Sequence, residues 1–270
     1  MMMLKDKTHN TYISAYKELK HIFESYDKYF KSFKLLTDNE INLYECFFIV
    51  FQDSLISHCL CKKHYVDNLT RKLTKIGKTT LISRKGKFYH EKFHIFFNQV
   101  QLIVLLPESL IVVMKNYLIE KIELENIEGI EPFFDYLNRT IINKVSHKMS
   151  FFKRILESTH YEPQTSNSAE SQNGRLNQYI FSLSRSRKLN TIVRSLRCFL
   201  ITDYRRQETQ FKAKKSNYRP SSSAIDHYLR AKLFVEKVLK IGVYPSRRYL
   251  SKIAALMRPD YFYGPLNSPQ

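Results

Sequence analysis

The stretch "IGVYPSRRYLSKIAALM", residues 241–257, predicts the end of one helix, a sharp turn and a second helix. Gly242 permits the left-handed backbone conformation that a sharp helix exit requires. Pro245 prevents the first helix from continuing, and Ser246 is a residue type whose side chain caps a following helix. We therefore predict a helix-turn-helix with helices over about 225–241 and about 246–257.

Apolar residues on both sides of this turn recur at helical spacing, which gives each helix a face for packing. The two helices are expected to face each other through these residues. They are Leu229, Leu233, Phe234, Val238 and Ile241 in the first helix, and Leu250, Ile253, Ala254 and Met257 in the second.

The start of the second helix carries polar and basic residues, as a helix that contacts bases does. They are Arg247, Arg248, Ser251 and Lys252. An arginine fork matches guanine as well as phosphate, and the amides of a helix N-terminus favour a phosphate. The alternative is a packing corner with surface arginines, because helix pairs of this kind also occur in folds that bind nothing.

The distribution of charge favours the nucleic-acid interpretation. The chain has a net charge of +19, and residues 175–270 hold 20 Lys/Arg against 5 Asp/Glu, whereas residues 1–174 hold 24 against 20. A field concentrated in this way attracts polyanions, of which nucleic acid is the commonest and an acidic membrane surface the competitor. It also supplies the non-specific affinity that a DNA-binding domain needs.

Two further basic segments precede the helix pair. A helix is predicted over about 176–207, and "FKAKKSNYRPSSSA" (211–224) is predicted to be a loop or mobile arm. We expect these segments to run along a nucleic-acid backbone. Their candidate contact residues are Arg194, Arg197, Arg205, Arg206, Lys212, Lys214, Lys215 and Arg219.

Composition predicts a mainly α-helical chain, since only 6 glycines and 8 prolines interrupt it. The polar run "STHYEPQTSNSAESQNG" (158–174) indicates a flexible linker, and the charge balance changes just after it. We predict a helical N-terminal domain over 1–160, a linker over 161–174 and a basic helical domain over 175–270. The N-terminal domain is expected to mediate self-association or to contact a protein partner.

Within the N-terminal half, helices are predicted over 9–35, from Thr37 through Leu60, around Leu69 and Leu73 with a C-cap at Gly77, over 109–122 and over 132–157. "TTLIS" and "KFY" flank "RKGK", which predicts a β-hairpin with Gly86 at its turn. A helix followed by a basic hairpin suggests a winged helix near 37–97. Its tip could contact phosphates, or it could be an ordinary surface hairpin. The tip residues are Arg84, Lys85 and Lys87.

The sequence gives weaker support for a metal site or a catalytic site than for nucleic-acid binding. Cys59, Cys61, His90 and His94 could form a zinc site, but the single residue between the cysteines is unusual, so we expect neither metal nor cofactor. No nucleophile–base motif is present, so we expect no enzyme. A strip of glutamates, Glu120 to Glu131, could hold Mg²⁺, be a solvated face, or act as an internal counter-surface for the basic domain.

The function expected from the sequence is DNA binding, as a regulator or as a replication or transposition accessory factor of a bacterium or mobile element. The alternatives are an RNA-binding or ribonucleoprotein subunit, with Tyr204, Tyr218 and Tyr249 stacking on bases, and a subunit that docks on an acidic partner. No signal peptide or spanning segment is evident. A cytoplasmic protein without a membrane partner is expected, on the nucleoid in a bacterium or in the nucleus of a eukaryote.

Overall fold

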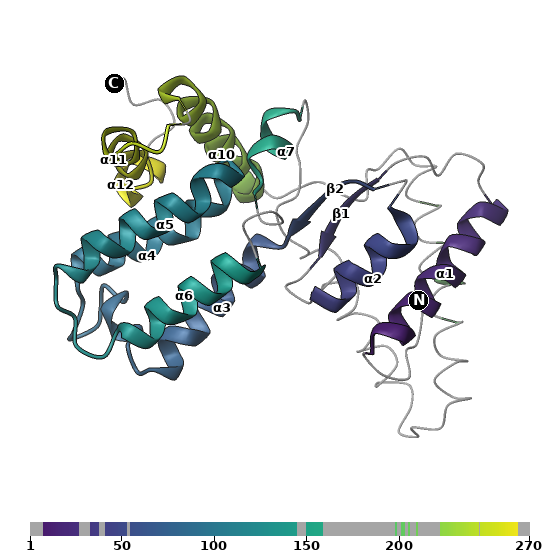
Figure 1. Ribbon diagram of the computed structural model, residues 1–270, viewed down its shortest axis with the longest axis horizontal. Coiled ribbons are helices and arrows are strands. Elements are labelled where there is room, and N and C mark those ends of the chain that lie inside the picture. Colours follow the sequence, from purple (N-terminus) through teal and green to yellow (C-terminus); the bar gives the residue numbers. More distant parts are fainter. Residues whose placement is uncertain are drawn as a thin grey trace. The chain divides into compact units, whose positions relative to one another are not determined.

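The structure of this protein is a computed structural model (Figure 1). Within the described part the protein is mainly helical, as predicted. Contacts group residues 1–165 and 228–270 into one compact unit and residues 166–227 into another. The domain limits at 160 and 175 stay predictions, because they fall outside the described residues. Those are residues 8–26, 33–37, 41–52, 55–144, 150–158, 198, 201, 202, 205, 209, 222–242 and 244–263.

The N-terminal part is a β-α-β unit with a helix packed on it. Helix α1 (His9–Tyr26) precedes β1 (Phe33–Thr37), α2 (Ile41–Phe51) and β2 (Leu55–Leu60), and the two strands pair in parallel. The Tyr16 ring of α1 lies edge-on to Phe47 of α2, with 5.0 Å between the ring centroids. Cys46 donates its Sγ–H to the His9 carbonyl oxygen at 3.3 Å.

The helices predicted over 9–35 and through Leu60 are therefore too long. Residues 33–37 and 55–60 are strands instead. Short apolar runs such as "LISHCL" have no period that separates a strand from a helix. A parallel strand also depends on a partner from elsewhere in the chain, which local spacing does not reveal.

The main core is built by helices from residue 62 onward. Helices α4 and α5 lie side by side, as do α3 and α6 (Figure 1). The prediction around Leu69 and Leu73 is confirmed, because both are fully buried and Gly77 has a φ of 70° just after the helix. The elements are α3 (Lys62–Lys75), the 3-10 helix η1 (Thr79–Leu81), α4 (Glu91–Leu102), the 3-10 helix η2 (Ile103–Leu105), α5 (Glu108–Glu123), α6 (Glu131–Lys144) and α7 (Phe152–Leu156).

The helix predicted over 109–122 is confirmed by α5. The single helix predicted over 132–157 corresponds to two elements, α6 and α7, and residues 145–149 between them lie outside the described part. Ser150, at the far side of that gap, donates its hydroxyl hydrogen to the Leu106 carbonyl at 2.6 Å. This bond ties the start of α7 to the end of η2.

The predicted β-hairpin is wrong. Residues 79–81 form η1, and residues 84–88 form turns rather than a strand pair. The Gly86 amide donates to the Ser83 carbonyl oxygen at 2.7 Å, and the His90 amide donates to Leu81 at 3.1 Å. The chain between α3 and α4 thus bonds to itself locally. Because the hairpin was the wing of the expected winged helix near 37–97, that interpretation loses its basis.

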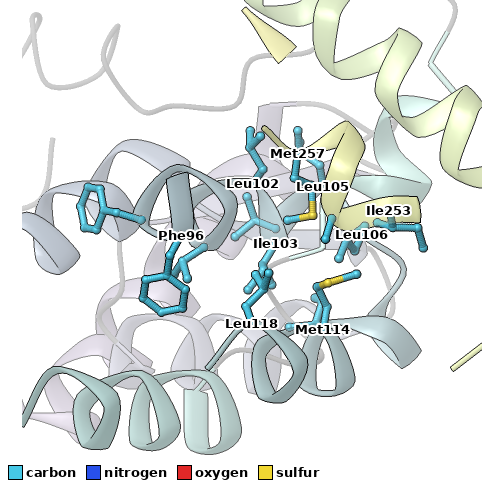
Figure 2. Packing of buried hydrophobic residues seen from close by; sticks show 14 of the residues in the cluster. Phe96, Leu102, Ile103, Leu105, Leu106, Met114, Leu118, Ile253 and Met257 are labelled. Carbon is cyan, nitrogen blue, oxygen red and sulfur yellow. The ribbon is translucent and has the colours of Figure 1, made fainter. Parts of the chain in front are cut away.

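The C-terminal helices complete the same core (Figure 2). Helix α10 (Ser222–Ile241) leads to α11 (Arg247–Leu256) and α12 (Pro259–Phe262), close to the limits predicted for the helix pair. Ile253 and Met257 lie among Leu102, Leu105 and Met114. Gln99 of α4 donates its side-chain amide to the Ala254 carbonyl oxygen at 2.7 Å. Helix α11 therefore rests on α4 and α5.

The buried face of α10 differs from the predicted one. Leu229 and Leu233 are 44% and 43% exposed, while Phe234 and Val238 are buried as expected. The remaining buried positions are Tyr228, Ala231 and Val235. The helix carries apolar residues on two neighbouring faces, and only the surrounding structure determines which face is buried.

Helix α5 contains a buried cation. Lys115 is 1% exposed and donates a hydrogen bond from Nζ to the Asn138 side-chain oxygen on α6. Desolvation by burial lowers the pKa of Lys115 below its ordinary value, because the charged form loses hydration. No acidic partner is recorded for this lysine in the described part of the chain.

None of the described helices combines the length and apolarity that crossing a bilayer requires.

Candidate nucleic-acid interface

The turn between α10 and α11 has the backbone that its sequence predicts. Gly242 has a φ of 95°, which is the left-handed side that glycine adopts without strain. Its amide donates to the carbonyl oxygens of Val238 and Leu239, at 3.1 and 3.2 Å, and closes the last turn of α10. A Cβ at this position would lie 2.9 Å from Cε2 of Tyr244, so a larger residue here would also have to displace the Tyr244 ring.

Ser246 occupies the N-cap position of α11, but not in the way predicted. Its side chain makes no capping hydrogen bond. Its backbone carbonyl oxygen accepts from the amides of Tyr249 and Leu250, at 3.0 Å each. The first turn of α11 thus closes on the Ser246 backbone, and the side chain of Ser246 is exposed.

Helix α11 separates its apolar and polar residues onto opposite faces. Leu250, Ile253 and Ala254 are buried against the core. Every predicted contact residue on the helix is exposed, namely Arg247, Arg248, Ser251 and Lys252. Arg248 and Lys252 are four residues apart and therefore lie on one face. Neither forms an ion pair within the part of the chain that the structure describes.

Arg247 differs from its neighbour because an acid of α5 holds it. One guanidinium nitrogen of Arg247 donates to the Glu120 carboxylate. The two side chains are 79% and 58% exposed, so solvent screens the pair and it contributes at most about 1 kcal/mol. Glu120 belongs to the strip of glutamates, Glu120 to Glu131, that was expected as one alternative to face the basic domain. The Arg247–Glu120 ion pair joins this strip to α11.

Aromatic side chains border the same face. Tyr244 is 60% exposed, and its ring centroid is 5.1 Å from that of Tyr249, with the planes tilted by 46°. The Lys252 ammonium lies 6.0 Å from the centre of the Tyr249 ring. A planar ligand beside α11 would therefore find the exposed Tyr244 ring next to Tyr249, and the Lys252 ammonium on Tyr249.

The structure describes only some of the other predicted contact residues. Arg205 is exposed. The rest of that set lies outside the described residues, and its role stays a prediction: Arg194, Arg197, Arg206, Lys212, Lys214, Lys215 and Arg219. Arg84, Lys85 and Lys87 are exposed as predicted, but they sit in turns and not on a wing.

Three cations near α11 escaped the sequence analysis. Lys92 of α4, Lys121 of α5 and Arg258, which follows α11, border one groove. They are distant in the sequence and lie on three separate elements, so no local motif connects them. Only the packing of α11 on α4 and α5 brings them together.

The proposed zinc ligands have other contacts. His90 caps α4, because its Nδ1 accepts from the Phe93 amide at 3.1 Å. His94 has its Nδ1 3.0 Å from the Ile82 carbonyl oxygen. Cys61 is buried at the start of α3, and Cys59 lies on β2 with its side chain outside the description. The described residues contain no group of three or more His, Cys, Asp or Glu that could hold a metal ion.

Comparisons of the chain with family models, with curated proteins and with solved structures find no match.

Proposed function

We propose that this protein binds nucleic acid, duplex DNA in preference to RNA, through the exposed face of α11. The observation that supports this proposal most strongly is the division of α11 between two surroundings. Its apolar face is fixed in the core through Leu250, Ile253 and Ala254, while Arg248, Ser251 and Lys252 point to solvent from its first two turns. A basic helix that is held rigidly and exposed at its N-terminal end suits the major groove.

Arg248 is the first candidate for contact with a base edge. Its guanidinium fork matches the two acceptors of guanine, and no acid of the described chain competes for it. Lys252, one turn further on, is suited to a phosphate or to guanine. Ser251 lies between them with a hydroxyl that both donates and accepts. Arg247 would first have to leave Glu120, at a cost of at most about 1 kcal/mol.

The net charge of residues 175–270 supports a large sequence-independent component of the affinity. We propose that Lys212, Lys214, Lys215 and Arg219 contribute phosphate contacts, and that the N-terminal helices mediate assembly. A regulator, or an accessory factor of replication or transposition, would combine these properties.

A second candidate function is binding of single-stranded nucleic acid, above all RNA. The exposed ring of Tyr244 beside Tyr249 favours it, since an unpaired base can stack on such a ring. The two candidates differ in which residues carry the binding energy. Duplex binding depends on Arg248 and Lys252, whereas single-strand binding depends on Tyr244.

The deciding experiment uses the full chain and randomised pools of duplex DNA, single-stranded DNA and structured RNA at one salt concentration. Bound fragments are selected, and the affinity of the best of them is then measured with four variants, Arg248→Ala, Lys252→Ala, Tyr244→Ala and Lys240→Ala. Lys240 is an exposed cation at the end of α10 and serves as the control of equal charge.

For duplex binding we expect Arg248→Ala to weaken the selected sequence by about 1–3 kcal/mol and to reduce discrimination at one position. Lys252→Ala should weaken all sequences alike and flatten the salt slope by about one unit, as loss of a phosphate contact does. Lys240→Ala should change little. Selection of RNA together with a dominant effect of Tyr244→Ala would replace the duplex proposal by the second one. The absence of any selected nucleic acid would contradict both and favour an acidic protein partner.

A further inference from the structure

A groove of about 490 Å³ lies between α4, α5 and α11, beside the proposed nucleic-acid face, with which it shares Ser251. Its size falls in the range of small-molecule sites, about 300–1,000 Å³. Three elements distant in sequence form its walls. The hydrogen bond from Gln99 to the Ala254 carbonyl, 2.7 Å long, fixes two of them to each other. The walls of the groove are therefore held in place by the packed core.

The inner surface of the groove is apolar. Phe96 of α4, Leu118 and Ile122 of α5, and Ala254 of α11 line it, and all four are buried side chains of the main core. Phe96 and Leu118 lie in the same packed region in Figure 2. Hydrocarbon placed here would be removed from water, which stabilises it by roughly 25 cal/mol per Å² of area buried.

The border of the groove is cationic. Lys92, Lys121 and Arg258 line it together with a single acid, Glu125. Glu125 accepts a hydrogen bond from Lys92 at 2.8 Å and so neutralises that lysine. Arg258 contacts Asp260 through Nε at 3.3 Å. Lys121 makes no ion pair within the described residues, and its Nζ lies 4.8 Å from the centre of the Tyr117 ring.

We propose that this groove binds a small amphiphilic anion, a carboxylate carried on a hydrocarbon chain. The chain would lie along Phe96 and Ile122, and the carboxylate would face Lys121 and Arg258. An inorganic anion would use the cations but leave the apolar surface uncovered. Two turns of a peptide helix, about 10 Å wide and 11 Å long, would be larger than the groove. The proposal stands independently of nucleic-acid binding.

Calorimetric titration of the full chain with three probes tests this inference. Decanoate has both the chain and the carboxylate, acetate has the carboxylate alone, and decyltrimethylammonium has the chain with the opposite charge. We expect decanoate to bind at a single saturable site. Acetate and decyltrimethylammonium should bind at least about tenfold more weakly, which corresponds to about 1.4 kcal/mol. Equal binding of all three probes, or no saturable decanoate binding, would overturn the proposal.

Variants then locate the site. Ala255→Trp places a large side chain at an exposed lining position and should reduce decanoate affinity at least about tenfold. Lys121→Gln and Arg258→Gln should each reduce it by about three- to tenfold, and Lys240→Gln, outside the groove, should leave it unchanged. Thermal unfolding checks that Ala255→Trp is folded. If it is not, the double variant at Lys121 and Arg258 decides, since unchanged affinity there would show that decanoate binds elsewhere.

Discussion

Helix α11 and the basic turn segment, residues 79–90, both expose basic residues, and the sequence marked both as candidates for nucleic-acid contact. Only α11 has the secondary structure that the prediction required. Its buried face is anchored by Ile253, and Met257 directly after the helix is also fully buried. In the basic turn segment a single residue, Leu81, is buried, and the cations of its tip sit on local turns.

The difference shows what makes a basic segment a good candidate interface. Charge attracts a polyanion wherever it lies, but recognition of a base requires a side chain held in a defined place. Arg248 stands on a helix whose opposite face is packed in the core. Arg84 and Lys85 stand on turns, so their positions depend on a few backbone hydrogen bonds. We therefore rank α11 above the basic turn segment as an interface.

The largest expected effect concerns the anchor of α11. Ile253→Ala removes fully buried side-chain volume and should lower the free energy of unfolding by about 2–5 kcal/mol. Ile225→Ala, at an exposed position of α10, is the matched control and should change it by no more than about 0.5 kcal/mol. Urea unfolding followed by circular dichroism measures both. Similar values for the two variants would mean that α11 is not anchored in the core.

The glycines that precede the two regions give the next comparison. Gly242→Ala should cost about 2–3 kcal/mol, because a residue with a side chain is strained at a φ of 95° and its Cβ meets the Tyr244 ring. Gly77→Ala, with a φ of 70° and no atom within 4 Å of the new Cβ, should cost about 1 kcal/mol. The order of the two thermal midpoints tests this expectation, and a reversed order would contradict it.

Nucleic-acid affinity tests the ranking directly. If α11 is the interface, the double variant Arg248→Ala/Lys252→Ala should lose about 2–4 kcal/mol of binding free energy for the selected duplex. Arg84→Ala/Lys85→Ala removes the same charge from the basic turn segment and should lose less than about 1 kcal/mol at physiological salt. Equal losses would show that net charge alone determines the binding.

The next prediction concerns Lys115, the buried lysine of α5, because α11 packs on this helix. Lys115→Met should raise the free energy of unfolding by about 1 kcal/mol at pH 7, because it removes a desolvated charge. The folded-state pKa of Lys115 is below that of the unfolded chain, so the unfolded state binds more protons and wild-type stability should rise with pH up to about 10.4. The advantage of the variant should shrink over the same range. Lys121→Met, an exposed change on the same helix, keeps Lys115, so the stability of this variant should rise with pH as that of the wild type does.

The smallest effect is expected for the ion pair that joins the two helices. Glu120→Gln should change the free energy of unfolding by less than about 1 kcal/mol, since solvent screens the pair. It should strengthen duplex binding by a similar amount, because it frees Arg247 and removes a negative charge. Weaker binding by Glu120→Gln would indicate that Glu120 orients Arg247 for contact.

Sequence reasoning succeeded where local signals suffice. The limits of α5 and the buried face of α3 follow from apolar periodicity, and Gly77 and Gly242 adopt the predicted left-handed backbone. It failed where distant contacts decide. The parallel pairing of β1 with β2 has no local signature, and α10 has two apolar faces, so periodicity could not choose between Leu229 and Tyr228 for the core.

The candidate site divides in the same way. The exposed residues of α11 could be listed from the sequence, because an amphipathic helix has a predictable outer face. The sequence predicted, as one alternative, that the glutamate strip faces the basic domain, but it did not predict the ion pair between Arg247 and Glu120. The groove and its cations were missed, since Lys92, Lys121 and Arg258 come together only when α11 packs on α4 and α5.

The hydrogen bond from Gln99 to Ala254 also bears on how the protein is made. These residues are 155 positions apart in the sequence, so α11 can dock only after a long loop closes, which slows folding. On the ribosome, α4 and α5 are complete long before α11 has been synthesised, because folding starts from the N-terminal part during translation. Until α11 docks, the site it will cover on α4 and α5 is open to solvent, and a chain stopped before residue 247 would carry that exposed apolar surface permanently.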